Sequence, residues 1–455
     1  MKTRLLPLAL GIALGSAALA PATLCAADLP PPIGISVGNS LADFFTATLN
    51  NSPELSIARA RWSVGTARKD QATGQLLPQV NANASVSDND RTDNATGRQT
   101  YRGERYGVSI SQVLFYWQAF QARRQARLVE DQNEAEYYAT LANLLTEVAD
   151  QYLLVLQAED ALRSVNAELD AMSNQLKRVQ ALYDLQLTRV TDLYETQARF
   201  AATQANAVQL ESEVTITREN LRASSGIDIG TLRRLPQAIT IEPLQDPIEV
   251  WLQRTQEHNK ELAARELALQ AADKQVSAAR GSYLPQVSLT YQYQGSNVGF
   301  DNQSLSQKVD TNYIGLNVAV PLFAGGSNSA RVREAFGLRN IAEGQLRQAQ
   351  MDLLARTRQA YAQVKTGEAR IRAGQALAES TVTSLTAMQR GYELGSVTTV
   401  DVLNALRDRF ASERDLQRAR YDHIRARLAL LRDSGSLSAD DILDISASME
   451  TATAQ

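Results

Sequence analysis

The segment YELGSVTTVDV at residues 392–402 is a second version of the segment YDLQLTRVTDL at residues 183–193. A similar spacing relates three further pairs of segments: LPQV at 77–80 and 284–287, SG at 225–226 and 434–435, and NSPEL at 51–55 with HNKEL at 258–262. The spacing stays between 207 and 209 residues along the chain, and chance similarity does not keep so constant a register. The chain is therefore an internal tandem duplication.

Each half is predicted to contain a helix, two strands joined by a loop, a very long helix, a short turn and a shorter helix. The strands fall at about 78–116 and 285–324, with loops over 88–104 and 295–311. Apolar and polar residues alternate in the strands, which is typical of membrane-barrel strands and also of a half-buried soluble sheet. Four strands are too few to close a barrel, and open edges cannot face lipid. A membrane barrel would therefore need several copies of the chain.

The helices predict an elongated shape. Residues 117–185 contain neither proline nor glycine, and such a helix is about 100 Å long. Its counterpart over 325–390 has a similar length, and the helices over 191–223 and 400–432 are about half as long. The helices predicted over 41–76 and 248–283 are also about half as long, so one long helix matches two shorter ones stacked end to end. This equality predicts a cylinder with a belt around its middle, built from residues 28–40, 226–247 and 435–455.

The composition agrees with a mainly helical chain. Only 24 of the 455 residues are glycine and 12 are proline, while 44% are hydrophobic. That hydrophobic content excludes intrinsic disorder. The net charge of −4 gives no field that collects phosphates, which excludes a strongly basic nucleic-acid binder.

The first 27 residues are predicted to be a secretory signal peptide. Lys2 and Arg4 precede an apolar run, and small residues precede a cleavage site after Ala26 or Ala27. A membrane anchor and a lipoprotein attached at Cys25 are the weaker alternatives. No later stretch has the ~18 consecutive apolar residues of a transmembrane helix. The mature chain is thus either periplasmic and soluble or inserted in the outer membrane as a barrel.

The chain resembles the TolC family of outer-membrane factors along nearly its whole mature length. The resemblance is carried by the repeated LPQV motif, by VPLFAGG at 320–326 before a long helix, and by YELGSVTTVDVL at 392–403. It implies a homotrimer whose 12-stranded β-barrel, four strands from each protomer, continues into a periplasmic α-helical barrel. It also implies a passive duct for proteins or small toxic compounds, opened at its tips by a periplasmic adaptor and an inner-membrane ABC or RND transporter.

Candidate pore residues follow from helical spacing and from the resemblance. Asp401, Asn404 and Asp408 are spaced to lie on one helical face, and a threefold axis would make each position a ring. Carboxylate rings favour cations. The resemblance implies a constriction at Asp401 and Asn404, where some relatives carry a second aspartate. A helix-capping or first-turn role for Asp401 is equally compatible with the sequence.

The resemblance also implies a latch between neighbouring tips. It points to Asp192 and Tyr392, with Gly395 and Thr399 in the second turn. An arginine that some relatives place there is Val397 here, and Arg189 of the first tip is a candidate substitute. Gln186 replaces the glycine expected in the first turn.

The residues offer no enzyme chemistry. Neither a phosphate-binding loop nor a Cys/His metal motif nor a nucleophile elbow occurs in the sequence, so we expect no catalytic residue, cofactor or metal. His258 and His423 are predicted to be solvated or interhelical. A soluble periplasmic coiled-coil scaffold or adaptor remains the alternative to a channel, and a periplasmic hydrolase is a third.

The expected domain division is a signal peptide at 1–27, a first repeat at 28–226 and a linker at 227–247. A second repeat at 248–435 and a tail at 436–455 complete the chain.

Overall fold

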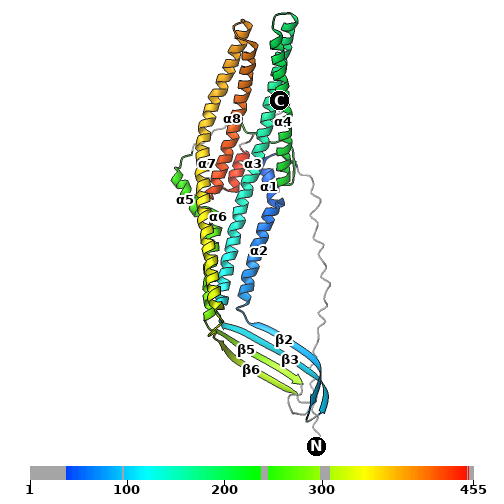
Figure 1. The fold of residues 1–455 in the computed structure, drawn as a ribbon, viewed down its shortest axis with the longest axis vertical. Coiled ribbons are helices and arrows are strands. Elements are labelled where there is room, and N and C mark those ends of the chain that lie inside the picture. The colour runs from blue at the N-terminus through cyan, green and yellow to red at the C-terminus, as the bar shows by residue number, and fades with distance from the viewer. Residues whose placement is uncertain (1–36, 95–96, 237–243, 298–307, 448, 450–455) are drawn as a thin grey trace.

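The computed structural model describes residues 37–94, 97–236, 244–297, 308–447 and 449. Long helices lead from a curved sheet at one end to two hairpin tips at the other (Figure 1). The predicted signal peptide lies outside the described residues, as does part of each segment of the predicted belt.

Two long helices run most of the length of the molecule. They are α3 (Trp117–Asp184), with 68 residues, and α7 (Ser327–Glu393), with 67, so each is about 100 Å long. Helices α4 (Val190–Ser225) and α8 (Thr399–Asp433) return beside their tip halves. These four predicted helices are confirmed. In the described part of the chain, no helix combines the length and the apolar content needed to cross a membrane.

The helices predicted as continuous over 41–76 and 248–283 are each interrupted. They form α1 (Leu41–Asn51) and α2 (Pro53–Gly74), then α5 (Ile248–His258), α6 (Lys260–Arg280) and the 3₁₀ turn η1 (Gly281–Tyr283). Local caps cause both breaks. The Ser52 hydroxyl accepts a hydrogen bond from the N–H of Leu55 (3.3 Å), and the Asn259 side chain accepts one from the N–H of Leu262 (3.1 Å). Such caps replace the missing intrahelical partners at a helix start.

The same two breaks join the stacked helices. The Asn51 amide donates to the Ser225 carbonyl at the end of α4 (3.3 Å), and the Asn259 amide donates to the Asp433 carbonyl at the end of α8 (3.0 Å). Both α4 and α8 are followed by a left-handed glycine, Gly226 at φ 73° and Gly435 at φ 70°. The shorter helices therefore meet near the middle of the long ones, as predicted.

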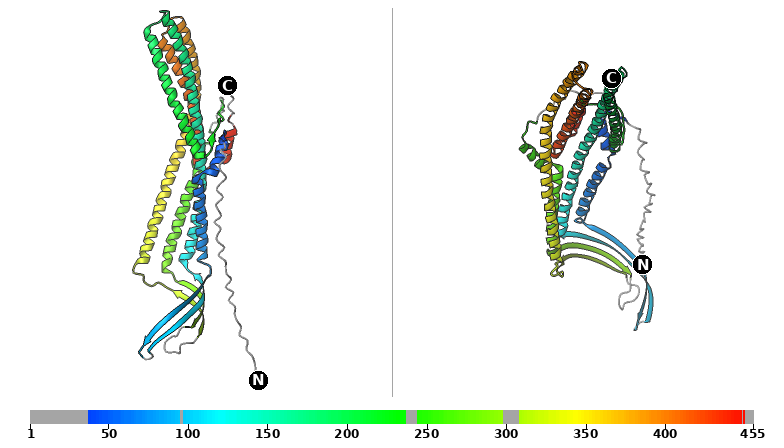
Figure 2. Two further views of the ribbon diagram at one scale, coloured as in Figure 1. Left: turned by 90° about the vertical axis from the view of Figure 1, so that its right-hand side faces the viewer. Right: turned by 45° about the horizontal axis from the view of Figure 1, so that its top comes forward.

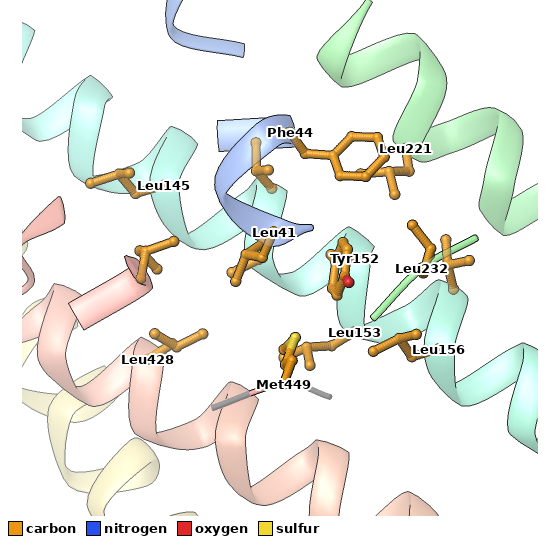
Figure 3. Packing of buried hydrophobic residues seen from close by; sticks show 14 of the residues in the cluster. Leu41, Phe44, Leu145, Tyr152, Leu153, Leu156, Leu221, Leu232, Leu428 and Met449 are labelled. Atoms are coloured by element: carbon orange, nitrogen blue, oxygen red, sulfur yellow. The ribbon is translucent and has the colours of Figure 1, made fainter. Parts of the chain in front are cut away.

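A hydrophobic core lies at this midpoint (Figure 3). Helices α1 and α9 (Ala439–Ala447) pack against α3, and the short strands β1 (Val37–Gly38) and β4 (Asp228–Ile229) pair in parallel beside them. The Phe44 and Tyr152 rings lie 5.8 Å apart, and the buried Tyr152 hydroxyl donates to the Arg233 carbonyl (2.9 Å). We call α1, α9, β1 and β4 the belt. The long helices form a layer that we call the slab, and helices α1 (blue) and α9 (red) lie together on one side of it (Figure 2).

The sheet at the other end has four antiparallel strands in the order β2-β3-β5-β6. They are β2 (Gln79–Asp93), β3 (Gly97–Phe115), β5 (Gln286–Asn297) and β6 (Val309–Ala319). The contact between β3 and β5, in which Val108 pairs with Tyr293, joins the two halves of the duplication. Within the described residues, β2 and β6 each leave one edge unpaired.

The loop predicted over 88–104 is wrong, because β2 continues to Asp93 and β3 begins at Gly97. Polar side chains there suggested a loop, but backbone pairing needs no apolar side chain, and an ion pair between Arg98 and Asp90 bridges the two strands. The second predicted loop, 295–311, is also too long. β5 extends to Asn297 and β6 begins at Val309.

Candidate functional site

The two helical hairpins end in short turns at the end of the molecule farthest from the sheet (Figure 1). Residues 185–189 join α3 to α4, and residues 394–398 join α7 to α8. These turns, which we call the first and second tip, contain or lie within three residues of all the site residues expected from sequence except Asn404 and Asp408.

The two tips share one backbone conformation. Gln186 has φ 58° and Gly395 has φ 73°, both in the left-handed region. After each, one N–H reaches back five residues: Leu187 donates to the Leu182 carbonyl (2.8 Å) and Ser396 to the Gly391 carbonyl (2.9 Å). This is the 6→1 bond of a glycine-type helix end. The turn geometry is thus kept although Gln186 replaces glycine.

Asp401 is held by the start of α8. The N–H and hydroxyl of Thr398 donate to its carboxylate (3.0 and 2.6 Å), and the N–H of Asp401 donates to the Thr398 hydroxyl (3.3 Å). This capping box confirms the first-turn role of Asp401. The bonds from Thr398 hold the pKa of the exposed Asp401 carboxyl below its usual range. The neighbouring Thr399 is buried, and its hydroxyl has no partner among the described residues.

The other two pore candidates differ from Asp401 in their surroundings. Asn404 is half-buried, whereas Asp408 is exposed and forms an ion pair with Arg407 (2.8 Å). Of the three positions, only Asp401 therefore carries a carboxylate that has no cationic partner in the described chain.

The latch residues do not meet within one chain. Asp192 accepts a hydrogen bond from the Thr188 hydroxyl (2.9 Å), and Arg189 is exposed at the position before α4. No hydrogen bond or ion pair joins Asp192, Arg189 and Tyr392 in the described residues. Val397 folds over Gly391, where an added Cβ would lie 2.2 Å from a Val397 methyl carbon. Val397 thus helps to pack the second tip.

Sequence reasoning missed four polar contacts between the hairpins. They are Arg178–Glu393 (3.1 Å), Glu168–Arg414 (2.6 Å), Asp160–Tyr421 (2.6 Å) and Asp150–Arg425. They follow α3 from the tips towards the belt, and we call them the hairpin contacts. The partners are 215 to 275 residues apart. No local pattern could have found them.

The histidines lie as predicted. His258 is exposed, and His423 is buried between helices, where burial lowers the pKa of its imidazole. Within the described residues, no three His, Cys, Asp or Glu side chains are grouped so that they could hold a metal ion.

Comparison with known proteins decides the family. The family model described as outer membrane efflux protein matches residues 46–227 and 251–436. The chain belongs to this family. It is 27% identical over 416 residues to the outer membrane protein TolC of Vibrio cholerae, which covers 91% of this chain and 94% of that protein. It is 26% identical to the alkaline protease secretion protein AprF of Pseudomonas aeruginosa, covering 88% of this chain and 85% of that one.

Solved structures share the fold. The Campylobacter jejuni outer membrane channel CmeC matches with a TM-score of 0.78 at 15% identity, covering 90% of each chain. CusC, whose structure concerns transmembrane channel formation, matches with a TM-score of 0.77 at 20% identity, covering 89% of this chain and 94% of that one. The fold, mainly helical with a sheet at one end, is therefore that of the outer-membrane channels, in which a β-barrel continues into a helical tunnel.

This membership decides between the functions left open by the sequence. The protein is an outer-membrane channel of the efflux and secretion type, with its helices in the periplasm, and it is not a soluble scaffold. Its family and its structural neighbours are transport channels.

Proposed function

We propose that three copies of the chain form one export duct. The supporting observation is the sheet, whose edge strands β2 and β6 each lack a partner within the described chain. An unpaired edge cannot face lipid, and a twelve-stranded barrel made from three such sheets leaves no edge. Each long helix would then continue the wall of the barrel into the periplasm.

The duct would work within a tripartite system. A periplasmic adaptor would contact the tips, and an inner-membrane ABC or RND transporter would supply the energy. The similarity to AprF, a protein named for protease secretion, and to TolC supports export from such a system. The cargo would be proteins, small toxic compounds or both.

The hairpin contacts would hold each protomer's part of the tunnel entrance closed. The exposed pair Arg178–Glu393 lies nearest the tips, and the buried pair Glu168–Arg414 lies deeper. Separating the hairpins would break the outer contact first at little cost, because exposed ion pairs contribute ~0–1 kcal/mol. The inner contact, which is largely shielded from solvent, would break only as the hairpins separate further.

Asp401 would form the selective ring of the entrance. Its capping box fixes the carboxylate on the first turn of α8, and a threefold axis would repeat it three times. Asn404 would add a neutral ring, and Asp408 would contribute less because Arg407 offsets its charge. The result is a weakly cation-selective pore.

The proposed latch would join neighbouring copies. Asp192 and Arg189 in one copy and Tyr392 in the next would meet where the tips of two protomers touch, with Gly395 and Thr399 shaping the second tip. We also propose the domain division at residues 27, 226, 247 and 435, because the two segments matched by the family model, 46–227 and 251–436, each follow one repeat and end within one residue of its end.

Planar-bilayer conductance with light scattering on the same purified sample tests the duct. A trimeric mass with small, cation-selective conductance steps is the expected result. A detergent-independent monomer that never conducts contradicts the proposal.

Two matched variants test Asp401. Asp401→Asn removes the charge and keeps an oxygen that accepts from Thr398, whereas Thr398→Ala removes the cap and keeps the charge. The reversal potential across an about tenfold KCl gradient should fall towards zero in Asp401→Asn and stay unchanged in Thr398→Ala. Equal effects would mean that helix capping, and not charge, accounts for the role of Asp401.

A further inference from the structure

Arginines gather where the long helices meet the sheet. The first three turns of α3 carry Arg123, Arg124 and Arg127, the first two turns of α7 carry Arg331 and Arg333, and α6 ends with Arg280. All six side chains are exposed. Within the described chain none of them forms an ion pair with a carboxylate. A protein with net charge −4 thus has a strongly positive end.

Helix stability does not explain this placement. The arginines lie beyond the first turn of each long helix, where the macrodipole has little effect, and no acidic residue in the first turn offsets them. The feature is present in both halves of the duplication. Arg123 and Arg333 donate to the hydroxyls of Thr73 and Ser329 (3.1 and 3.4 Å), and Arg280 lies over the Phe336 ring (5.0 Å). Arg124 and Arg127 form no hydrogen bond or ring contact among the described residues, so these two are free to bind a partner outside the chain.

Two of the arginines are oriented by the packing of α3. In helices that pack as coiled coils, residues seven apart keep the same neighbours. Arg124 is 21 residues before Leu145, and Arg127 is 21 residues before Val148; both apolar residues are buried under the belt. Arg124 and Arg127 thus lie on the belt side of the slab.

The belt side is the outer side if the helices enclose a tunnel, because α1 and α9 would otherwise obstruct it (Figure 2). This step rests on the proposed function. One heptad farther from the sheet, the same two positions carry Asp131 and Glu134. Arg127 forms no ion pair with Asp131 although the two are four residues apart. The positive charge on this face is therefore confined to the turns next to the sheet.

Those turns lie within reach of a membrane surface. Trp117 begins α3, and Tyr283, Leu322 and Phe323 near the same level are 52%, 93% and 89% exposed. Exposed aromatic residues at the end of membrane strands are typical of the lipid–water interface. Arg124 is seven residues into α3, about 10 Å from its start, and Arg127 is about 15 Å from it. Arginine side chains extend towards an interface, and charges act over a Debye length of about 8 Å.

We propose that Arg124 and Arg127 bind the phosphate groups of anionic phospholipids in the periplasmic leaflet of the outer membrane. Three copies would surround the duct with a cationic ring. The ring would collect anionic lipid at the level where the barrel becomes the tunnel and fix the depth of the protein in the membrane.

Tryptophan quenching by brominated lipid tests this directly, because Trp117 lies at the junction. The full chain is inserted into phosphatidylcholine vesicles that contain equal fractions of brominated phosphatidylglycerol or brominated phosphatidylcholine. The protein should bind phosphatidylglycerol preferentially, and each arginine should contribute about fivefold. The preference should weaken in high salt.

Arg124→Gln/Arg127→Gln should remove most of the preference, up to about 25-fold. Arg358→Gln/Arg372→Gln, at the middle and on the tipward half of α7, removes the same charge from exposed positions far from the sheet and should leave the preference intact. A Trp62→Phe/Trp251→Phe background isolates Trp117. If that background does not insert into vesicles, the same variants can be made in the wild-type protein, because the other two tryptophans lie away from the sheet.

No preference in the wild type, or equal losses in the two double variants, would overturn the proposal. The outcome is separable from that of the proposed duct. Quenching requires neither an adaptor nor open tips, and the light-scattering mass reports the trimer independently.

Discussion

The buried pair Glu168–Arg414 gives a prediction whose size follows from the structure. The guanidinium and carboxylate lie 2.6 Å apart, and the side chain of Glu168 is only 7% exposed whereas that of Arg414 is 22% exposed. Arg414→Ala leaves a buried carboxylate without its cation, which costs about 3–5 kcal/mol. Glu168→Leu leaves an arginine that reaches solvent with its charged end. It should therefore cost less, about 1 kcal/mol, as for an ordinary hydrogen bond.

Hydrogen exchange of the peptides around residues 160–172 and 410–418 measures this cost locally. A loss of about 3 kcal/mol in the free energy of local opening corresponds to an increase in the opening constant of about 150-fold. Glu393→Ala breaks the exposed Arg178–Glu393 pair, whose side chains are 50% and 57% exposed, and serves as the control. It should change exchange by about fivefold or less.

The double variant Glu168→Leu/Arg414→Leu should restore most of the protection, because no charge remains buried. If Arg414→Ala changed exchange no more than Glu393→Ala, the buried contact would not restrain the hairpins, and the proposed order of opening would be wrong.

Three further predictions concern the tips and the buried histidine. Gln186→Gly should slow hydrogen exchange at the first tip about fivefold, because a left-handed residue other than glycine costs about 1 kcal/mol. Gly395→Gln should speed hydrogen exchange at the second tip by a similar factor. Faster exchange in Gln186→Gly or slower exchange in Gly395→Gln would contradict the left-handed backbone at these two positions. Hydrogen bonds from Thr398 lower the pKa of Asp401, so cation selectivity should persist at pH 4, and its loss by pH 5 in reversal-potential measurements would oppose the assignment. Burial lowers the pKa of His423, so its contribution to stability is complete above the unfolded value of about 6.5 and is lost as the pH falls from that value through the lowered pKa of the folded state. The melting temperature should fall between pH 7.5 and 5.5, and less so in His423→Gln.

The sequence by itself determined the elements and their order. The duplication, the two long helices, their return helices and the four strands follow from repeats, breaker residues and alternation, which are local signals. The capping role of Asp401 was also local, since Thr398 and Asp401 are three residues apart. The helix breaks at Ser52 and Asn259 are local as well, because both side chains cap the helix that follows, yet the absence of a strong breaker predicted continuous helices there.

Only the tertiary structure decided what distant parts of the chain do to one another. The pairing of β3 with β5, the meeting of Asn51 with Ser225 and the ion pair of Glu168 with Arg414 join residues that are 172 or more positions apart. Such contacts depend on how rigid elements pack, and a charged residue on a helix surface has many equally good partners in sequence. The faces of α3 are the clearest case. Arg124 and Leu145 occupy equivalent positions in the heptad. The belt buries Leu145 and leaves Arg124 exposed near the sheet, and the helices of the belt come from the two ends of the described chain.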